Sequence, residues 1–263
     1  MSNKKNYNQG DIWNHYVQNS FPKVKEKQAE RNLQYPGDEW QTDKFWDYVF
    51  NEIFAKVIPK DAEYFIEIGS GAGKQTAKIL EQYPNSKVIA FDISSQFLDA
   101  YKERFSGQLN KRVFANLLNE EFTFIFDTIK KMGLVGKIDC FYSMDAMVHV
   151  DLQHLISYWL SAALVLKDGG KLIMDVANYK TEKGFAKLMR DIKNYYRFHG
   201  AACTKFQFMS EDVVGSILPK IGFLPKFHKD PRQYCLFEGV LVERNLALNE
   251  IKNANLDWHL ELQ

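Results

Sequence analysis

Three glycines, each separated from the next by one residue, mark the part of this sequence that is best suited to bind a ligand. Residues 66–74 read Ile-Glu-Ile-Gly-Ser-Gly-Ala-Gly-Lys, between an apolar run and a helical pattern. This position predicts a turn from a strand into a helix. Glycine lets the backbone turn sharply and lets a ligand come into van der Waals contact with the main chain.

The residues around this loop distinguish it from two other kinds of nucleotide-binding loop. A nicotinamide dinucleotide fingerprint requires glycine at position 74, where this chain has Lys74. A P-loop requires Gly-Lys-Ser/Thr, and Gln75 follows Lys74 instead. Asp92 ends the next predicted strand, where a carboxylate can accept both hydroxyl hydrogens of a ribose. The pattern indicates a nucleoside ligand; the alternative is an ordinary tight turn, with Asp92 capping a helix.

Short apolar runs alternate with helical patterns from residue 61 onward. Strands are predicted at 64–68, 87–91, 112–115, 137–142 and 171–176, and helices at 73–82, from Ser94 or Ser95, from Asp151 to the turn at 168–170, and on to about 196. Two later runs, 222–227 and 234–242, are typical of an antiparallel pair. The alternation predicts an α/β fold with a mostly parallel sheet covered on both faces. Ligands of such sheets bind beyond the carboxyl ends of the strands.

Composition narrows the class of protein. The 263 residues are 46% hydrophobic and 25% charged, which excludes a disordered or collagen-like chain. Lys and Arg number 34 and Asp and Glu 33, a net charge of +1, which argues against a nucleic-acid partner. Three cysteines are too few and too scattered for a disulfide framework or a zinc cluster. Neither a signal peptide nor a membrane span is recognisable, so a cytoplasmic location is predicted.

The first 60 residues are rich in aromatic side chains, and we expect them to form an N-terminal helical cap, followed by one domain over 61–263. The Tyr-Pro-Gly-Asp turn at 35–38 breaks this cap. Two interpretations remain open. The cap completes the core, or it forms a lid that excludes water from a substrate. In the second case the candidate substrate-binding residues are Trp13, Tyr16, Tyr35 and Trp40.

With these motifs the chain resembles the class I S-adenosylmethionine-dependent methyltransferases, over about 61–180 and more loosely beyond. Residues 67–73 match the family's E/D-x-G-x-G-x-G motif in full, and Lys-Asp-Gly-Gly at 167–170 resembles Leu-Lys-Pro-Gly-Gly with Asp in place of Pro. The resemblance implies a Rossmann-like, mostly parallel seven-stranded sheet with an antiparallel C-terminal strand, and S-adenosyl-L-methionine as the cofactor. The cofactor-binding residues that it implies are Glu67, Gly69, Ser70, Gly71, Gly73, Asp92, Ile93, Asn116, Leu117, Ser143 and Met144.

Two further residues follow the fourth predicted strand. Methyl transfer to an oxygen needs a base, and Asp145 and His149 lie four residues apart, on one side of a helical turn if one begins there. Histidine has an ordinary pKa of about 6.5 and can accept a proton at neutral pH, so His149 is the candidate base. Asp145 would orient it or contact the substrate. The alternative is a partly buried histidine satisfied by a carbonyl, with Asp145 capping a helix.

The acceptor is inferred from what surrounds this segment. The DNA amino-methyltransferase motif has prolines that Ser-Met-Asp-Ala at 143–146 lacks. Asp145 and the segment 175–178 only partly resemble the acidic residues of metal-dependent catechol-type members, so no metal is predicted. A histidine just after the fourth motif is similar to bacterial small-molecule O-methyltransferases, including those that act on sugars. Arg232 can pair with an anionic group of the substrate, although a single arginine is usually on the surface.

Three rival functions remain. The first is a methyltransferase that acts on a protein or another nucleophile. The second is a nicotinamide-dependent oxidoreductase, and the third is a non-catalytic protein that binds the nucleoside. The sequence does not name the acceptor, and it leaves a monomer and a homodimer equally open.

Overall fold

The computed structural model describes residues 9–119, 121–197, 205–256 and 258, which divide into two compact units. The first unit comprises residues 1–118 and 186–206, and the second comprises 119–185 and 207–263. The sequence predicted another division, with a cap over 1–60 and a domain over 61–263. These boundaries do not coincide with those of the two compact units, and the cap stays a prediction.

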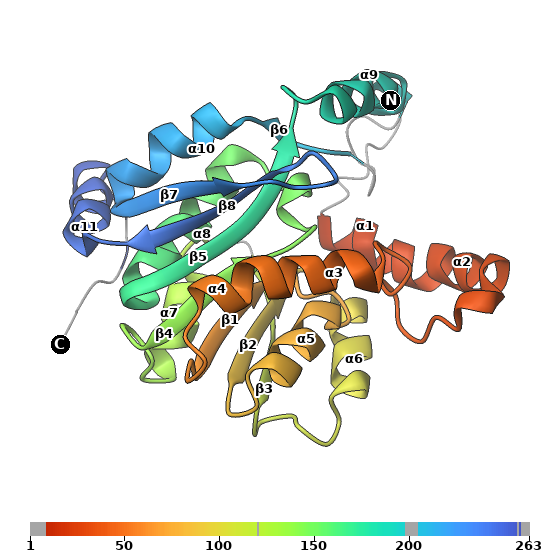
Figure 1. Ribbon diagram of the computed structural model, residues 1–263, viewed down its shortest axis with the longest axis horizontal. Helices are drawn as coiled ribbons and strands as arrows, with labels where there is room; N and C mark the ends of the chain where they lie inside the picture. Colours follow the sequence, from red (N-terminus) through yellow and green to blue (C-terminus); the bar gives the residue numbers. More distant parts are fainter. Residues whose placement is uncertain (1–8, 120, 198–204, 257, 259–263) are drawn as a thin grey trace, which may run out of the picture. The chain divides into compact units, whose positions relative to one another are not determined.

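The first unit begins with helices and continues with three parallel strands (Figure 1). Strand β1 pairs with β2, and β2 pairs with β3, all in parallel. The strands are apolar and, in β1 and β2, almost entirely buried, as expected when helices cover both faces of a parallel sheet. The elements of this unit in chain order are α1 (Gln9–His15), α2 (Phe21–Lys27), α3 (Asp43–Val49), α4 (Ala55–Val57), β1 (Tyr64–Ile68), α5 (Lys74–Gln82), β2 (Lys87–Asp92), α6 (Ser95–Arg104) and β3 (Val113–Leu117), with π-helical turns at Tyr16–Ser20 and Phe50–Phe54.

The second unit contains the remaining strands. Strand β5 pairs in parallel with β4 and with the two-residue β6, and in antiparallel with β8, which in turn pairs with β7. Its elements are α7 (Phe124–Lys131), β4 (Ile138–Ser143), α8 (Leu152–Val165), β5 (Leu166–Asn178), β6 (Phe208–Met209), α10 (Glu211–Ile217), β7 (Phe223–His228), β8 (Cys235–Leu241) and α11 (Arg244–Asn253). Helix α9 (Glu182–Arg197) begins in this unit and ends in the first.

The predicted fold class is confirmed: the chain is a mixed α/β protein with parallel strands, an antiparallel C-terminal strand and surrounding helices. Each predicted strand is present, and β6 is an eighth that was not expected. The N-caps are also as predicted, since Ser94 accepts from Phe97 N–H at the start of α6 and Asp151 accepts from His154 N–H at the start of α8.

The segment 167–170 differs from its prediction as a turn that ends a helix. Helix α8 ends at Val165 and β5 starts at once, but Ile138 pairs with Leu166 whereas Cys140 pairs with Lys171. The four residues between therefore bulge from the strand opposite Asp139, whose carboxylate pairs with Lys167.

Two thiols and one absence complete the description. Cys140 and Cys235 are buried free thiols, and Cys203 lies outside the described residues. Within the parts of the chain that the structure describes, no helix is both long and apolar enough to cross a membrane.

Gly73 gives a test of the packing beneath the glycine loop. Its φ is 84°, and an added Cβ would collide with Phe105 and lie 2.8 Å from the ring of Tyr101. We expect Gly73→Ala to lower the free energy of unfolding in urea by about 3 kcal/mol, because backbone strain and overpacking both oppose it. The control Gly133→Ala has a φ of 69° and open space around the added methyl, so it should cost only about 1 kcal/mol. Equal losses in the two variants would contradict the packing argument.

Candidate active site

The glycine loop between β1 and α5 is built from left-handed backbone. Gly69, Gly71 and Gly73 have φ values of 69°, 54° and 84°, which residues other than glycine rarely adopt. The N–H groups of Gly69 and Ser70 donate to the carbonyl of Phe91, at 2.8 and 3.2 Å. The loop is thereby fastened to the end of β2, next to the predicted ribose-binding carboxylate.

Asp92 is the last residue of β2 and connects the glycine loop with the start of α6. Its Oδ2 accepts from Gly71 N–H and its Oδ1 from Ser94 N–H, both at 2.8 Å. Ser94 itself provides the N-cap of α6, so the alternative in which Asp92 caps the helix does not apply. A carboxylate has about four lone-pair positions. The two main-chain bonds therefore leave acceptor capacity on both oxygens for a pair of hydroxyls.

The environment of Asp92 also changes its acidity. The residue is 6% exposed, and burial raises the pKa of its carboxyl to about 6, although the N–H groups of Ser94, Gly71 and Ile93 act in the opposite direction. The carboxylate is thus ionised at neutral pH and becomes protonated under mildly acidic conditions.

Two polar side chains of the glycine motif lie in the interior. Glu67 is buried and accepts from the hydroxyl of Thr76 on α5. The hydroxyl of Ser70 is buried too, and it has no hydrogen-bond partner within the part of the chain that the structure describes. A buried hydroxyl without a partner is costly. The Ser70 hydroxyl therefore fits a site whose ligand supplies the missing bond.

The ends of β2 and β3 present apolar side chains beside Asp92. Ile93 and Leu117 are both exposed, and Asp92 and Leu117 are register partners. Asn116, predicted to contact the ligand, donates through Nδ2 to the carbonyls of Ala90 and Phe114, each at 3.2 Å. Its amide nitrogen is therefore engaged by the sheet itself, and a role toward a ligand stays a prediction.

The N-terminal segment brings three of its four predicted aromatic residues together. Trp13, Tyr16 and Trp40 are half-buried, and their rings lie 5.4–6.0 Å apart between centroids. All three also contact the ring of Phe97 on α6, at 5.9–6.3 Å. We call these four rings the aromatic cluster. Tyr35 lies apart from it, with the guanidinium of Arg104 4.5 Å from its ring centroid.

The aromatic cluster adjoins the glycine loop. A Cβ added to Gly71 would lie 3.7 Å from the ring of Phe97, which is ordinary contact distance. Asn14 of α1 reaches the same place, because its Oδ1 accepts from the hydroxyl of Ser94 at 2.8 Å and from Gln96 N–H at 3.2 Å. Phe97 and Asn14 were not predicted as site residues, since nothing local in the sequence pairs an asparagine in the first helix with a helix start 80 residues later.

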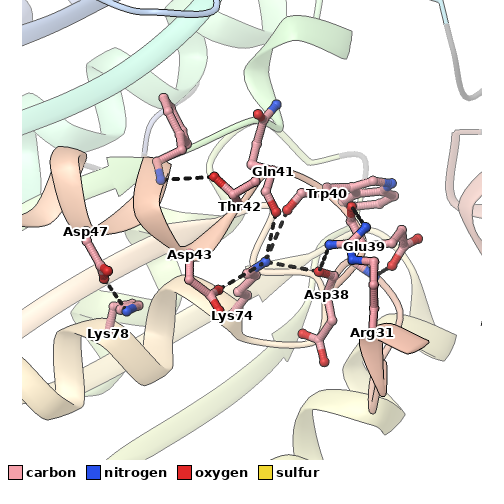
Figure 2. Close-up of polar contacts among 12 residues, drawn as sticks. Arg31, Asp38, Glu39, Trp40, Gln41, Thr42, Asp43, Asp47, Lys74 and Lys78 are labelled. Atoms are coloured by element: carbon pink, nitrogen blue, oxygen red, sulfur yellow. Dashed lines mark hydrogen bonds and ion pairs between the residues drawn. The ribbon is translucent and has the colours of Figure 1, made fainter. Parts of the chain in front are cut away.

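Lys74, singled out because it stands where a nicotinamide motif has glycine, binds the main chain of the N-terminal segment. Figure 2 shows its ammonium group among carbonyl oxygens of the segment 38–41. The side chain is 15% exposed, and burial lowers its pKa, against the influence of Asp43 and Asp38.

In the second unit, the end of β4 is held by an arginine and three carboxylates. Asp145 has a φ of 62°; its N–H donates to Asp175 Oδ1 at 2.8 Å and its Oδ1 accepts from Arg232 Nη1 at 3.2 Å. Arg232 Nη2 also pairs with Asp175 and Asp230, both at 2.5 Å. Tyr234 completes this group, since the Arg232 guanidinium lies 4.4 Å from its ring centroid. Ser143 and Met144, at the end of the strand, are both buried.

This arrangement changes the roles considered for Arg232. Burial alone would lower the pKa of the guanidinium, but Asp175, Asp230 and Asp145 outweigh it and raise that pKa above its ordinary value. Burial raises the pKa of Asp175, which Arg232 opposes. A guanidinium that already faces three carboxylates is a poor partner for an anionic group of a substrate.

His149 ends a three-ten turn over Met147–His149 and is half-buried. The left-handed Asp145 precedes this turn, so no helical turn begins at Asp145 and the condition for aligning it with His149 is not met. The four-residue spacing therefore no longer supports an alignment of Asp145 with His149. Their roles in catalysis remain predictions. Among the described residues, no group of three or more His, Cys, Asp and Glu side chains can hold a metal ion.

Comparison with known proteins supports the predicted class of enzyme. The methyltransferase domain family matches residues 66–172, a segment that includes the glycine loop, Asp92, Asp145 and His149. This part of the chain is a methyltransferase domain, and it makes up less than half of the sequence. The match supports the predicted resemblance to the class I S-adenosylmethionine-dependent methyltransferases, an enzyme of this class and S-adenosylmethionine as its cofactor. No curated protein matches the sequence of this chain.

Solved structures show the same methyltransferase fold. An O-methyltransferase family protein from Burkholderia thailandensis has 17% identity and a TM-score of 0.55, over 74% of this chain and 57% of that one. The CurJ carbon methyltransferase has 16% identity and a TM-score of 0.55, over 89% and 62%. Magnesium protoporphyrin IX methyltransferase from Synechocystis PCC 6803, with bound S-adenosylhomocysteine, has 15% identity and a TM-score of 0.57, over 87% and 98%. This chain thus spans less than two thirds of the length of each of the first two neighbours.

The acidity of Asp92 predicts how cofactor binding depends on pH. The ionised carboxylate accepts two hydroxyl hydrogens and the protonated form does not, so affinity is complete above the pKa and is lost below it. With a pKa of about 6, we expect the affinity for S-adenosylhomocysteine in calorimetry to fall to about a half at pH 6 and about a tenth at pH 5. Asp92→Asn should bind weakly and without this dependence. The same pH profile in both proteins would contradict the assignment.

The group around Arg232 predicts a second, independent effect. Arg232→Met leaves three carboxylates without their cation, so we expect the free energy of unfolding to fall by about 3–5 kcal/mol at pH 8. The loss of unfolding free energy should be smaller at pH 5, because protonation of the carboxylates then reduces the repulsion between them. Arg232→Lys, which keeps one charge, should lose less. Urea unfolding of the three proteins at both pH values measures this, and a loss below about 1 kcal/mol in Arg232→Met would contradict it.

Proposed function

We propose that this methyltransferase transfers the methyl group of S-adenosylmethionine to a hydroxyl oxygen of a small molecule, with His149 as the base. The observation that carries the proposal is the position of His149, half-buried in the turn that directly follows the end of β4. A hydroxyl oxygen must lose its proton as it attacks the methyl carbon. A neutral imidazole can take that proton at physiological pH.

The cofactor, when bound, supplies an electrophilic methyl group on a sulfonium centre. The side chain of Asp92 accepts the two ribose hydroxyls, and Ile93 and Leu117 pack beside the adenine. Main chain at 69–73 and the Ser70 hydroxyl bind the amino-acid tail, since the glycines leave no side chain in the way. Asn116, Ser143, Met144 and Glu67 complete the proposed cofactor site, Glu67 by supporting the loop from below through Thr76.

The acceptor is proposed to be neutral and rich in hydroxyls, such as a sugar. Asp145 is the proposed contact to it, because its carboxylate lies at the end of β4 and is held there by Arg232. Three carboxylates around one guanidinium give this position an excess of negative charge, which disfavours an anionic acceptor. Arg232 then positions Asp145 instead of binding the substrate directly.

Trp13, Tyr16 and Trp40 are proposed to cover the site from the N-terminal segment. Half-buried rings exclude water and keep an apolar surface available to a ligand. Tyr35 fits this role less well, because it lies under Arg104 and outside the aromatic cluster.

A methyl acceptor other than oxygen is the alternative. One solved neighbour is a carbon methyltransferase and another belongs to an O-methyltransferase family, so the fold is compatible with both. A protein acceptor remains a possible substrate class. A nicotinamide-dependent oxidoreductase is disfavoured, because residues 66–172, which include the glycine loop, match the methyltransferase domain family.

We further propose that the protein works in the cytoplasm as a monomer or homodimer, without a metal, and with neither a nucleic-acid nor a membrane partner. The net charge of +1 supports this proposal, because a protein that binds phosphate backbones usually carries a basic excess.

Replacement of His149 tests the reaction. With transfer of a labelled methyl group to a panel of sugars and other hydroxyl metabolites as the assay, we expect His149→Ala to lower kcat by about 10²–10⁴-fold. Its affinity for S-adenosylhomocysteine should stay within about twofold, because the residue does not hold the cofactor. His154→Ala is the matched control, since His154 is exposed and pairs with Asp151 on α8. Unchanged turnover in His149→Ala would exclude His149 as the base, and a methylated carbon or nitrogen in the product would favour the alternative acceptor.

A further inference from the structure

The ammonium group of Lys74 binds the main chain of the N-terminal segment. Its Nζ donates to the carbonyls of Asp38 and Trp40, both at 3.1 Å, and of Gln41 at 3.4 Å (Figure 2). The carboxylate of Asp43, at the start of α3, lies 3.8 Å away. Three acceptors thus meet the three N–H donors of one ammonium group.

This arrangement is costly unless all of its bonds are made. A lysine on a helix surface normally keeps its charge in water, but the Lys74 side chain is largely buried. The three carbonyls replace the water molecules that the ammonium group has lost, and Asp43 adds a favourable charge. A methionine at this position would fill the same space and make none of these bonds.

The segment that Lys74 holds carries one ring of the aromatic cluster. Trp40 lies 5.9 Å from Trp13, 5.4 Å from Tyr16 and 5.9 Å from Phe97, between ring centroids. Phe97 in turn packs beside Gly71, since a Cβ added to Gly71 would lie 3.7 Å from the Phe97 ring. Lys74 directly follows Gly73 at the end of the glycine motif. A continuous chain of contacts therefore runs from Lys74 to the carbonyls of 38–41, to Trp40, to Phe97 and to Gly71, which is part of the same motif.

Arg31 and Arg104 also bind residues 38–39, and Lys78 binds the following helix α3, but none of the three follows the glycine motif. Arg31 donates to the carbonyl of Glu39 at 3.0 Å. Arg104, at the end of α6, pairs with Asp38 at 2.5 Å, and Lys78, one turn further along α5, pairs with Asp47 at 2.6 Å. Lys78 is thus a natural comparison for Lys74, because it joins the same helix α5 to the neighbouring α3 through a partly exposed ion pair. Such a surface pair contributes little on its own.

We propose that Lys74 is a positioning residue for cofactor binding, which holds residues 38–43 so that the aromatic cluster stays packed against the glycine loop and shields the bound S-adenosylmethionine from water. Lys74 does not touch the cofactor; it acts through Trp40 and Phe97. The inference rests on the proposed cofactor site at the glycine loop and Asp92, and adds a residue that controls access to it.

Three variants test the proposal: Lys74→Met, Lys74→Arg and the control Lys78→Met. We expect Lys74→Met to raise the Kd for S-adenosylhomocysteine and the KM for S-adenosylmethionine about tenfold. Without the lysine, part of the binding free energy must be used to order residues 38–43. The kcat of Lys74→Met should stay within about twofold, because no group at the reacting atoms has changed. Lys74→Arg should recover most of the affinity, and Lys78→Met should resemble the unsubstituted protein.

Hydrogen exchange separates positioning from a general loss of stability. In the unsubstituted protein, S-adenosylhomocysteine should slow amide exchange at residues 38–43, and in Lys74→Met this protection should be lost while amides in β1 and β2 stay protected. If Lys74→Met does not fold, Trp40→Leu tests the same chain of contacts while it keeps the lysine. This variant should show the same rise in the Kd for S-adenosylhomocysteine.

The outcomes are distinguishable from a failure of the proposed cofactor site. A Lys74→Met protein that binds as tightly as Lys78→Met, or a Trp40→Leu protein with unchanged Kd, overturns the role of Lys74 and leaves the cofactor site intact. An unsubstituted protein that does not bind S-adenosylhomocysteine overturns both.

Discussion

The carboxylate of Asp92 is the interaction on which the rest of the candidate site depends. Its two oxygens accept from the N–H groups of Gly71 and Ser94, so one side chain sets the distance between the glycine loop and the start of α6. The loop can approach it only because Gly69, Gly71 and Gly73 all adopt left-handed backbone. The cost of burying this carboxylate appears in its raised pKa. A ribose diol would supply two further hydrogen bonds to the same group, which is why cofactor binding and the acidity of Asp92 are linked.

The N-terminal segment is built around this interaction. Asn14 bonds to Ser94 and Gln96 beside Asp92, and the aromatic cluster packs against Gly71. The opposite end of the segment is held by Lys74, at the start of α5. Both attachments lie at the first turns of the two helices that follow β1 and β2. These attachments hold the segment beside the glycine loop and the end of β2, where a cover of the proposed cofactor site would lie.

Much of this fold could be predicted from the sequence because the signals are local. The apolar runs at 64–68 and 87–91 are too regular to be loops, and they became β1 and β2 nearly to the residue. Ser94 and Asp151 were recognisable as caps for the same reason. The glycine motif with Asp92 indicated a nucleoside site, and the segment that contains both matches the methyltransferase domain family. Helices α7, α10 and α11 were not predicted.

What the sequence could not show are contacts between residues far apart along the chain. Arg232 meets Asp145 and Asp175, 87 and 57 positions away, and no local pattern marks such a group. Asp145 likewise has left-handed backbone and donates its N–H to Asp175, 30 positions away, which no local pattern indicates. Lys74 was noticed only as the residue that breaks a nicotinamide motif, whereas its partners come from a segment more than 30 residues earlier.

An experimental structure with S-adenosylhomocysteine bound tests the central claim most directly. The account predicts both ribose hydroxyl oxygens within hydrogen-bonding distance of the Asp92 carboxylate, with the amino-acid tail against main chain at 69–73 and the Ser70 hydroxyl. A ribose held by other residues, with Asp92 bonded only to Gly71 and Ser94, would contradict it.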